Sequence, residues 1–532
     1  MLMVVMVLPR RKWSRFVVVA AVITLFAVLG AQILTWSSSA ATSSVSVEAE
    51  AGVKTGVVSD IADSSASSGS GVVFGRTVPS GEQYLPMLLP SQDVLKSSPK
   101  KVFAHYFTQF PISIDNKPAE SDYYAVNYLN PNGESGKHSS YGGFLRERPL
   151  PRPVIAAADW RLEDMKTEVR RATGAGLDGF TLDMLSLSGA HWDKMQLLLQ
   201  AATAVDPKFK ILLMPDGTTS VTADVNALAN SVAGMAQNSS AYRLADGRLV
   251  ISPFAPERQG AAWWQNWLAI MKSKGIDVAF VPCFVDYRNN VESFAPFSYG
   301  LSNWGSRSPA ANANIATNIT DAHNRGKLWM QSASTQDERP RSGVYDEAQN
   351  SENYRLTWDG AIRGDAEWVQ IPTWNDYTES AEIAPSTHIG WSLLDLTSYY
   401  VTKYKLGVEP TIRKDVVYVS HRVHPAAATP TGGQTRLMLL RAGSSQPRDM
   451  VEALTFLTAP AKVSVKIGAT AYTYDAPAGV YAKTYPLAAG TVSVSTTRIT
   501  TGQVTATATS TFPVTNSPVV QDLQYYFTSS AR

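Results

Sequence analysis

The sequence predicts an α/β protein, a (β/α)₈ TIM barrel followed by a C-terminal antiparallel β-sandwich-like domain. The chain has 532 residues, too many for one hydrophobic core of ordinary size, so at least two domains are expected. Between residues 99 and 408, short apolar runs alternate with longer amphipathic segments, a pattern typical of βα units. From residue 409 to 532 the helical periodicity disappears, and alternating or β-branched runs separated by Gly and Pro turns indicate antiparallel strands.

Residues 1–40 have the pattern of an export signal. The basic segment "PRRKWSR" precedes an uncharged apolar run, Phe16 to Leu34, which is followed by small residues. This order predicts a signal peptide with cleavage near Ala40. The apolar run is also long enough to cross a bilayer, so an uncleaved N-terminal membrane anchor is the alternative. Both interpretations predict an exported protein, secreted or extracellular, that contacts a membrane only if this segment stays uncleaved.

Residues 41–98 form a Ser- and Gly-rich segment whose simplest interpretation is a linker. Two stretches within it, "VSVEAEAGVKTGVV" and "ASSGSGVVFG", resemble the opening strands of carbohydrate-binding modules of the family 6 and 35 type. The remainder of such a module is missing. The segment is therefore interpreted as partial strands without a binding activity of its own.

Eight apolar runs bounded by turn residues supply the strands of the predicted barrel. Amphipathic segments lie between them, such as "AAWWQNWLAIMKSKG", which is expected to bury Trp263, Trp267 and Leu268 and to end at a glycine cap. Eight successive βα repeats favour a (β/α)₈ barrel over an open sheet. The predicted strand runs are 101–107, 178–185, 210–217, 248–254, 278–286, 297–305, 327–334 and 368–376.

Polar and aromatic residues gather where these runs end, which is the end of a barrel that carries active sites. An Asp after a strand is by itself usually a turn former or a helix cap. Their concentration at one end of the predicted barrel, mixing carboxylates, amides and indoles, indicates a sugar-binding site. The predicted substrate-binding residues are His105, Tyr106, Asp183, Asp216, Asp286, Trp304, Trp374, Asn375 and Tyr377, and other polar residues at these ends are Tyr287, Asn303 and Gln331.

Composition and missing motifs exclude several other functions. The formal net charge is +2 and charged residues are 17% of the chain, so no nucleic-acid partner is expected. The single cysteine, Cys283, cannot form an internal disulfide and lies in an apolar run, as a small buried side chain would. The HxxxH pattern, GxSxG and glycine-rich phosphate loops are absent, so neither a metal nor a cofactor is predicted. The chain is expected to act as a monomer on a polysaccharide.

The stretch "IPTWNDYTES", residues 371–380, places two carboxylates where the last predicted strand ends. Glycosidic cleavage generally requires two carboxyl groups, and Asp376 and Glu379 are the predicted pair. Positions three apart on a straight strand face opposite ways, whereas on a turn or a helical start they share a face. Their carboxyls could then lie ~6.5–9.5 Å apart, as inversion requires, or near ~5 Å, as retention requires.

Three stretches, "KVFAHYF", "GLDGFTLDM" and "TWNDYTES", resemble glycoside hydrolase family 71, the α-1,3-glucanases or mutanases. The resemblance covers about Val102 to Gly407 and implies a (β/α)₈ barrel that cleaves α-1,3-glucan internally with inversion, using Asp376 and Glu379. We assign Glu379 as the acid and Asp376 as the base. Family members commonly have Gly where this chain has Thr378, and some have Asn in place of Asp183.

Two alternatives remain open at this stage. One is a barrel glycosidase that acts on another α-glucan or cell-wall polysaccharide. The other is a non-catalytic polysaccharide-binding protein built on the same scaffold.

Overall fold

The computed structural model describes residues 58–62, 70–74 and 84–532. The chain divides into two units, residues 1–78 and 79–532. In the first unit, β1 (Val58–Ala62) and β2 (Ser70–Phe74) pair as an antiparallel hairpin. The predicted signal peptide or membrane anchor, residues 1–40, lies outside the described residues. Within the described ranges, no helix combines the length and apolar character needed to cross a bilayer.

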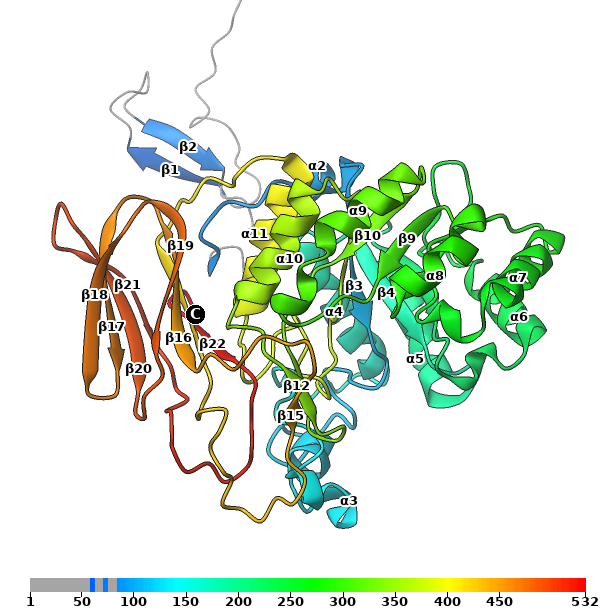
Figure 1. Ribbon diagram of the computed structural model, residues 1–532. Helices are drawn as coiled ribbons and strands as arrows, with labels where there is room; N and C mark the ends of the chain where they lie inside the picture. The colour runs from blue at the N-terminus through cyan, green and yellow to red at the C-terminus, as the bar shows by residue number, and fades with distance from the viewer. Residues whose placement is uncertain (1–57, 63–69, 75–83) are drawn as a thin grey trace, which may run out of the picture. The chain divides into compact units, whose positions relative to one another are not determined.

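The second unit is built on a curled, nine-stranded parallel sheet that is covered by helices and resembles a TIM barrel (Figure 1). Its strand order is β7-β6-β5-β4-β3-β13-β10-β9-β8. The two strands at the ends of this order, β7 and β8, are separated in the sequence only by Val281 and Pro282. The strands are β3 (Lys101–Tyr106), β4 (Gly179–Met184), β5 (Lys210–Pro215), β6 (Leu249–Ile251), β7 (Val278–Phe280), β8 (Cys283–Phe284), β9 (Gly300–Asn303), β10 (Leu328–Ser332) and β13 (Trp368–Ile371).

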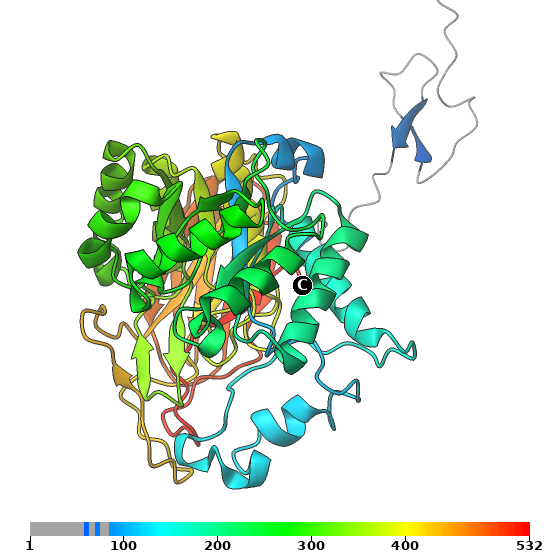
Figure 2. The ribbon, with the colours of Figure 1, turned by 90° about the vertical axis from the view of Figure 1, so that its right-hand side faces the viewer.

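Each of the eight apolar runs contains strand residues, and an α-helix lies between each run and the next. Figure 2 shows several of these helices around the sheet. Right-handed βα connections place such helices on the outside, where their apolar stripes cover the sheet. The helices between the runs are α4 (Trp160–Gly174), α5 (Gly189–Val205), α6 (Val225–Met235), α7 (Ala261–Ser273), α8 (Tyr287–Phe294), α9 (Ile315–Asn324) and α10 (Glu352–Arg363), and α11 (Ser392–Leu406) follows the last run.

Helix α7 shows how closely its sequence predicts its position. The helix ends before Gly275, whose φ of +77° lies in the left-handed region that glycine tolerates. Its fully buried residues are Trp264, Trp267 and Met271, while Trp263 and Leu268 are only partly buried. The predicted stripe was therefore rotated by about one residue.

Alternation along β3 divides its side chains between two cores. Phe103 belongs to an interior cluster with Leu212, Val250 and Met330. Val102, Ala104 and Tyr106 belong to the large cluster between the sheet and the helices. Because successive strand residues face opposite ways, Lys101, Phe103 and His105 share the face that points toward the inside of the curled sheet.

The C-terminal region contains two four-stranded antiparallel sheets, in the orders β19-β16-β14-β22 and β18-β17-β20-β21. Their apolar faces share one core cluster, to which Val417, Val451, Val463 and Val494 belong. The strands are β14 (Val416–His421), β16 (Met450–Leu457), β17 (Ala461–Ile467), β18 (Thr470–Ala476), β19 (Gly479–Pro486), β20 (Val492–Arg498), β21 (Val504–Thr509) and β22 (Tyr526–Ser529).

The C-terminal sheets are joined to the curled sheet by packing and by pairing. Tyr399 of α11 lies against Phe456 of β16, with ring centroids 5.1 Å apart. A three-stranded sheet combines β11 (Asp337–Arg339) and β12 (Val344–Asp346), which follow β10, with β15 (Leu439–Leu440) from the C-terminal region. Leu85, Met87 and Leu89 also enter the main core, although the sequence analysis placed them in the Ser- and Gly-rich segment.

A long connection between β3 and α4 lies near this three-stranded sheet at the same end of the molecule (Figure 1). The backbone N–H groups of Thr435 and Arg436 donate to the carbonyl of Ser140 in this connection, at 3.0 and 2.8 Å. Shorter elements complete the described part of the unit. They are α2 (Gln92–Ser97), α3 (Gly133–Gly136), η3 (Tyr124–Tyr128), η4 (Ser139–Tyr141), η5 (Ser220–Thr222), η6 (Pro256–Arg258), η7 (Ala295–Phe297) and η8 (Ala310–Asn312).

Candidate active site

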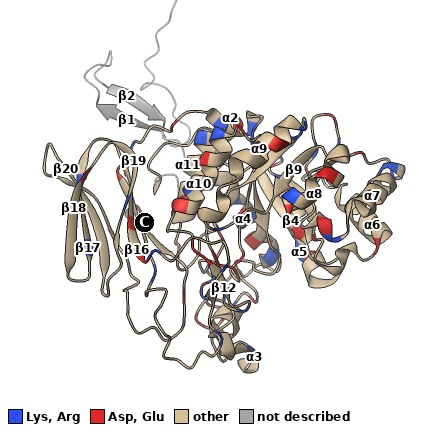
Figure 3. Cartoon of the chain, viewed as in Figure 1, with Lys and Arg blue, Asp and Glu red and all other residues tan. Residues whose placement is uncertain are grey.

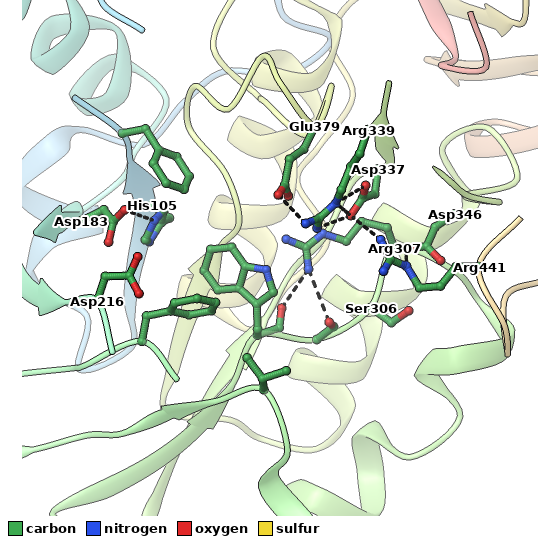
Figure 4. Close-up of a pocket in the computed structure, with 15 residues that line it drawn as sticks. His105, Asp183, Asp216, Ser306, Arg307, Asp337, Arg339, Asp346, Glu379 and Arg441 are labelled. Carbon is green, nitrogen blue, oxygen red and sulfur yellow. Dashed lines mark hydrogen bonds and ion pairs between the residues drawn. The ribbon is translucent and has the colours of Figure 1, made fainter. Parts of the chain in front are cut away.

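A pocket of about 370 Å³ lies at the carboxyl ends of the parallel strands, where the sequence analysis expects the site (Figure 4). Its walls come from the ends of β3, β4 and β5, from the loop after β9, from the β11–β12 sheet and from the loop that follows β15. The lining residues are His105, Phe107, Asp183, Asp216, Phe254, Val285, Trp304, Gly305, Ser306, Arg307, Asp337, Arg339, Asp346, Glu379 and Arg441.

One side of the pocket, here called the acidic wall, consists of His105, Asp183 and Asp216. All three are buried, and His105 Nε2 lies 3.9 Å from Asp183 Oδ2. Burial lowers the pKa of His105 to about 3, so the imidazole is neutral. Burial, with the charges of Asp216 and Asp376, raises the pKa of Asp183 well above its usual range. Burial thus favours the protonated form of the Asp183 carboxyl, which can both donate and accept hydrogen bonds.

One carboxyl oxygen of Asp216 is already hydrogen-bonded within the protein. Its Oδ1 accepts from the backbone N–H and the hydroxyl of Thr218, both at 2.7 Å. These bonds lower the pKa of Asp216, but burial outweighs them and the net shift is upward.

Three aromatic rings, from Phe107, Phe254 and Trp304, line the pocket between its polar walls. Trp304 lies edge-on to His105 and to Phe254, with ring centroids 4.8 Å apart in both pairs. All three rings are partly exposed. Such rings can stack on the apolar face of a sugar, so they supply the platform that the sequence analysis sought in Trp374 and Tyr377.

The opposite side, here called the arginine wall, consists of Arg307, Arg339 and Arg441 with the carboxylates Asp337 and Asp346. Arg339 binds Asp337 through its Nε, 2.7 Å from Oδ1. Arg441 Nε donates to Asp346 Oδ2 at 2.9 Å. Figure 4 shows the three guanidinium groups gathered on one side of the pocket, opposite His105, Asp183 and Asp216.

Glu379 stands at the edge of the arginine wall. Its Oε1 lies 2.6 Å from Arg339 Nη1, while its buried Oε2 has no hydrogen-bond partner among the described residues. Burial and the neighbouring Asp376 raise the pKa of Glu379 to about 8, against the opposing effect of Arg339. A carboxyl that stays protonated near neutral pH in a pocket has the property a general acid needs.

Asp376 is buried beside the pocket, with 4% of its surface accessible. Its Oδ1 accepts from the backbone N–H of Thr378 at 3.0 Å and from the Thr378 hydroxyl at 2.5 Å. Burial raises the pKa of Asp376, while the bonds from Thr378 and the charge of Arg339 lower it. The backbone N–H of Glu379 donates to the carbonyl of Asp376 at 3.4 Å, so the pair occupies a turn, the arrangement in which both side chains can serve one site.

Tyr106 and Trp374, expected at the substrate, instead point away from the pocket into the core between sheet and helices. The Tyr106 hydroxyl lies 3.4 Å from Glu168 Oε1, and Trp374 Nε1 donates to the other oxygen of the same carboxyl. Tyr106 follows His105 directly, so strand alternation sends it to the opposite face. The expectation that Tyr106 faces the site together with His105 was wrong for this physical reason. The expectation for Trp374 was also wrong.

Asn375 and Tyr377 are also buried away from the pocket. Asn375 Oδ1 accepts from the backbone N–H of Phe107 at 2.8 Å, and its amide donates to the carbonyls of Phe107 and Phe110. Tyr377 packs against Phe110, with ring centroids 6.1 Å apart. These contacts hold the turn that carries Asp376 and Glu379 against the segment after β3.

Asp286 is exposed and caps helix α8, where its Oδ1 accepts from the backbone N–H of Asn289. It lines a smaller neighbouring pocket together with Tyr287, Asn303 and Gln331. The structure therefore brings His105, Asp183, Asp216, Trp304 and Glu379 together in the main pocket, with Asp376 beside it, and leaves Asp286 outside.

The sequence analysis missed the arginine wall. Arg307 lies in "NWGSR", three residues after a strand-end tryptophan that was singled out. Asp337 and Arg339 lie in "QDERPRSG", a charged stretch directly after the seventh apolar run, whose position could have indicated a role. Arg441 offered no comparable signal because it is remote in the sequence and follows β15.

The described residues contain no group of three or more His, Cys, Asp or Glu side chains placed to hold a metal ion. The pocket instead combines carboxyls, guanidinium groups and aromatic rings. That combination suits neutral ligands rich in hydroxyl groups.

Curated relatives match more than half of the chain. The chain is 24% identical over 362 residues to the glucan endo-1,3-alpha-glucosidase agn1 of Schizosaccharomyces pombe, a match that covers 62% of this chain and 82% of that protein. It is 23% identical over 374 residues to a mutanase of Penicillium rubens, covering 64% of this chain and 79% of that protein.

Among solved structures, the GH99 endo-alpha-mannosidase of Bacteroides thetaiotaomicron is similar at 15% identity and a TM-score of 0.43, over 57% of this chain and 97% of that chain. A likeness this distant says nothing about function. The model of glycosyl hydrolase family 71 matches residues 154–530, which include most of the curled sheet and the C-terminal sheets. The chain belongs to glycosyl hydrolase family 71 and is a glycoside hydrolase.

Proposed function

We propose that this glycoside hydrolase is an endo-acting enzyme that cleaves α-1,3-glucan, with Glu379 as general acid and Asp376 as general base. The observation that carries the proposal is the turn at 376–379, which sets a carboxyl with a pKa of about 8 into the pocket beside a second buried carboxyl. The names of the curated relatives, a glucan endo-1,3-alpha-glucosidase and a mutanase, support the α-1,3 linkage.

In the proposed reaction, Glu379 donates its proton to the leaving glycosidic oxygen as the bond to the anomeric carbon breaks. Asp376 accepts a proton from the water that attacks this carbon from the opposite side. The protonated state of Glu379 follows from its burial and from Asp376, and one-step attack by water inverts the anomeric configuration. Detection of the α-anomer as the first product from an α-linked substrate would instead require a retaining route.

The aromatic rings of Phe107, Phe254 and Trp304 are proposed to bind the sugar faces. His105, Asp183 and Asp216 are proposed to bind hydroxyl groups on the other side of the cleaved bond. A neutral imidazole and a carboxyl whose protonated form burial favours suit this task, because each then has both a donor and an acceptor.

We also propose that the curled sheet is a closed (β/α)₈ barrel followed by a β sandwich. Support comes from the strand that contains β7 and β8. The backbone N–H of Val281 donates to Ile251 on one side, and the carbonyl of Phe280 accepts from Tyr299 on the other. β7 and β8 are then two halves of the fifth strand, which closes the ring. A crystal structure with this strand paired on one side only would contradict closure.

Export is proposed from the sequence of residues 1–40, with either cleavage near Ala40 or retention as an anchor. The protein is proposed to act as a monomer without nucleic acid. Acidic and basic residues are interspersed over the helices in the view of Figure 3, with no extended area of one sign there. Expression of the full chain, followed by N-terminal sequencing of the material in the medium and in membranes, decides between cleavage and anchoring.

The decisive experiment is release of reducing ends from insoluble α-1,3-glucan, compared with dextran, starch and β-glucans. The expected result is release from α-1,3-glucan alone, as a ladder of oligosaccharides that shows internal cleavage. Glu379→Gln is the matched inactive control. Preferential release from another α-glucan would reassign the substrate, and binding without any release would indicate a polysaccharide-binding protein.

A further inference from the structure

Arg307 occupies an unusual position for a charged side chain. It lines the pocket, yet only 2% of its surface is accessible. Burial lowers its pKa, and the charges of Asp337 and Glu379 oppose that effect. Arginine keeps its charge at any ordinary pH, so this is a buried cation.

The chain uses only part of the guanidinium group. Nη1 donates to the backbone carbonyls of Trp304 at 3.1 Å and Gly305 at 3.4 Å, and these two bonds point the group toward the pocket (Figure 4). Nε and Nη2 are buried and have no hydrogen-bond partner in the described part of the chain. Buried donors without partners are destabilising, so a retained pair in a pocket indicates that a ligand completes them.

Unused polar atoms on other residues of the pocket indicate what that ligand is. Glu379 Oε2, Asp183 Oδ1 and His105 Nδ1 are likewise buried without partners among the described residues. An anion would satisfy Arg307 but would also lie near Asp337, the carboxylate that pairs with Arg339 in the same wall. A neutral ligand with hydroxyl groups can accept from the guanidinium and donate to the carboxyls, so the set fits a carbohydrate.

The relation of Arg307 to Glu379 narrows the choice of hydroxyl. Both belong to the arginine-wall side of the pocket, and Glu379 contributes to the electrostatic environment of Arg307. If Glu379 protonates the leaving oxygen, Arg307 lies near the sugar that carries that oxygen. In a 1,3-linked glucan the leaving oxygen, at C3, has a hydroxyl on each neighbouring carbon, C2 and C4. In a 1,4-linked glucan only C3 carries one, and in a 1,6-linked glucan the neighbouring carbon carries none.

We propose that Arg307 is a specificity-determining residue whose Nε and Nη2 donate to the hydroxyl groups flanking the cleaved oxygen of the leaving sugar. The inference rests on the proposed function, because it takes Glu379 as the acid. A planar fork with fixed donors suits two flanking hydroxyls better than the single ammonium of a lysine does. Arg307 thereby contributes to the preference for the 1,3 linkage.

The first test compares Arg307→Met and Arg307→Lys with the wild-type full chain on soluble α-1,3-linked glucose oligosaccharides. Loss of a charge-assisted pair of bonds is expected to reduce kcat/KM on the order of 100-fold in Arg307→Met. Arg307→Lys is expected to restore little of this activity, because lysine lacks the planar pair of donors of the guanidinium group. Arg288→Met, which changes an exposed arginine on α8, is the matched control and is expected to stay within twofold of wild type.

Arg307 also holds two carbonyls and lies over the Trp304 ring, so a second measurement separates binding from support of the loop. Oligosaccharides that lack the hydroxyl at C2 or C4 of the leaving sugar are compared between wild type and the variants. Wild type is expected to lose activity on one or both analogues, whereas Arg307→Met loses no more, because the partner of that hydroxyl is already gone. If Arg307→Met does not yield soluble protein, Arg307→Lys provides the same comparison.

Two results would overturn the assignment while leaving the enzyme's function intact. One is a wild type active on α-1,3-glucan with Arg307→Met within threefold of it. The other is an equal loss of activity on the oligosaccharides that lack the C2 or C4 hydroxyl in wild type and in both variants. A wild type inactive on every α-1,3-linked substrate would overturn the proposed function and this inference together.

Discussion

The two polar walls of the pocket differ in their chemistry and in where they come from. Burial shifts the pKa values of the acidic-wall groups toward their neutral forms, with His105 at a pKa of about 3 and the pKa of Asp183 well above its usual range. The guanidinium groups of the arginine wall remain charged at any ordinary pH, and Asp337 and Asp346 lie beside them. Glu379 stands at the edge of the charged wall but takes a pKa of about 8, since Asp376 opposes a second negative charge.

The comparison shows that one site is assembled from two kinds of segment, the ends of regular strands and the loops or insertions beyond them. The acidic wall uses the ends of the first three parallel strands, β3, β4 and β5. The arginine wall uses a loop, a short inserted sheet and Arg441 from beyond β14. The C-terminal region is therefore part of the site as well as a support for the barrel-like unit.

The largest expected effect comes from deleting the C-terminal region, which supplies Arg441 to the arginine wall. Truncation after Gly407 deletes Arg441 and also the partners of Gln336 and Glu338, which accept from the backbone N–H groups of Tyr525 and Leu523 at 2.6 and 2.5 Å. It also uncovers Tyr399. A domain has only about 5–15 kcal/mol of net stability, so we expect insoluble or inactive protein.

Size-exclusion chromatography and activity on oligosaccharides check the truncated protein. A soluble, fully active fragment that merely binds insoluble glucan less well would show that the C-terminal region is a separable binding module. The conclusion that the arginine wall depends on the C-terminal region would then be wrong.

The next largest effect concerns the pair on the turn. Glu379→Gln and Asp376→Asn should each lower kcat about 10²–10⁴-fold, because each removes the group that gives or takes the proton. The melting temperature should change little, because each amide is nearly the same size as the carboxyl it replaces. Asp286→Asn is the matched control, a strand-end aspartate outside the main pocket, and should remain close to wild type.

An activated substrate separates the two roles. A good leaving group needs little protonation, so it should partly rescue Glu379→Gln and leave Asp376→Asn impaired. Rescue of the aspartate variant instead would exchange the two assignments. Wild-type turnover in either variant on α-1,3-glucan would remove that residue from the mechanism.

The pH profile tests whether Glu379 is the acid. The acid must be protonated, so kcat/KM should fall as pH rises through about 8, the pKa of Glu379. The base must be ionised, so activity should also fall on the acidic side, as pH drops through the raised pKa of Asp376. An alkaline limb near the ordinary pKa of a glutamate, about 4.3, would contradict the assignment.

A smaller effect is expected within the acidic wall. Because burial favours the protonated form of Asp183, Asp183→Asn preserves a donor and an acceptor there and should cost less than tenfold in kcat/KM. Asp183→Ala leaves a hole and removes both, so it should cost more. Equal losses in both variants, measured with oligosaccharides, would mean that the ionised form of Asp183 is needed.

No effect at all is expected from chelation. Exhaustive EDTA treatment should leave kcat unchanged, because neither wall offers a metal-binding group among the described residues. Loss of activity that calcium restores would show that Asp183 and Asp216 serve an ion rather than a sugar.

Much of the fold could be predicted because the apolar runs repeat with strand length and the helices with a period of 3.6. The pocket residues His105, Asp183, Asp216 and Trp304 could be predicted by the rule that strand ends carry the site. Tyr106 was misplaced because a list of strand-end residues ignores alternation, and Trp374 because it lies beyond the end of β13 and is buried in the core between sheet and helices. Arg307 was missed because nothing in "NWGSR" marks a side chain whose burial leaves two donors unused.

The sequence by itself determined the order of strands and helices, the family, and the turn that presents Asp376 and Glu379, because periodicity and local spacing are properties of neighbouring residues. Only the tertiary structure decided which aromatic rings reach the pocket, which carboxyls are neutral, and that Arg441 meets Asp346 across 95 positions of the chain. Those outcomes depend on burial and on long-range contacts between segments, and both arise only when the chain has folded.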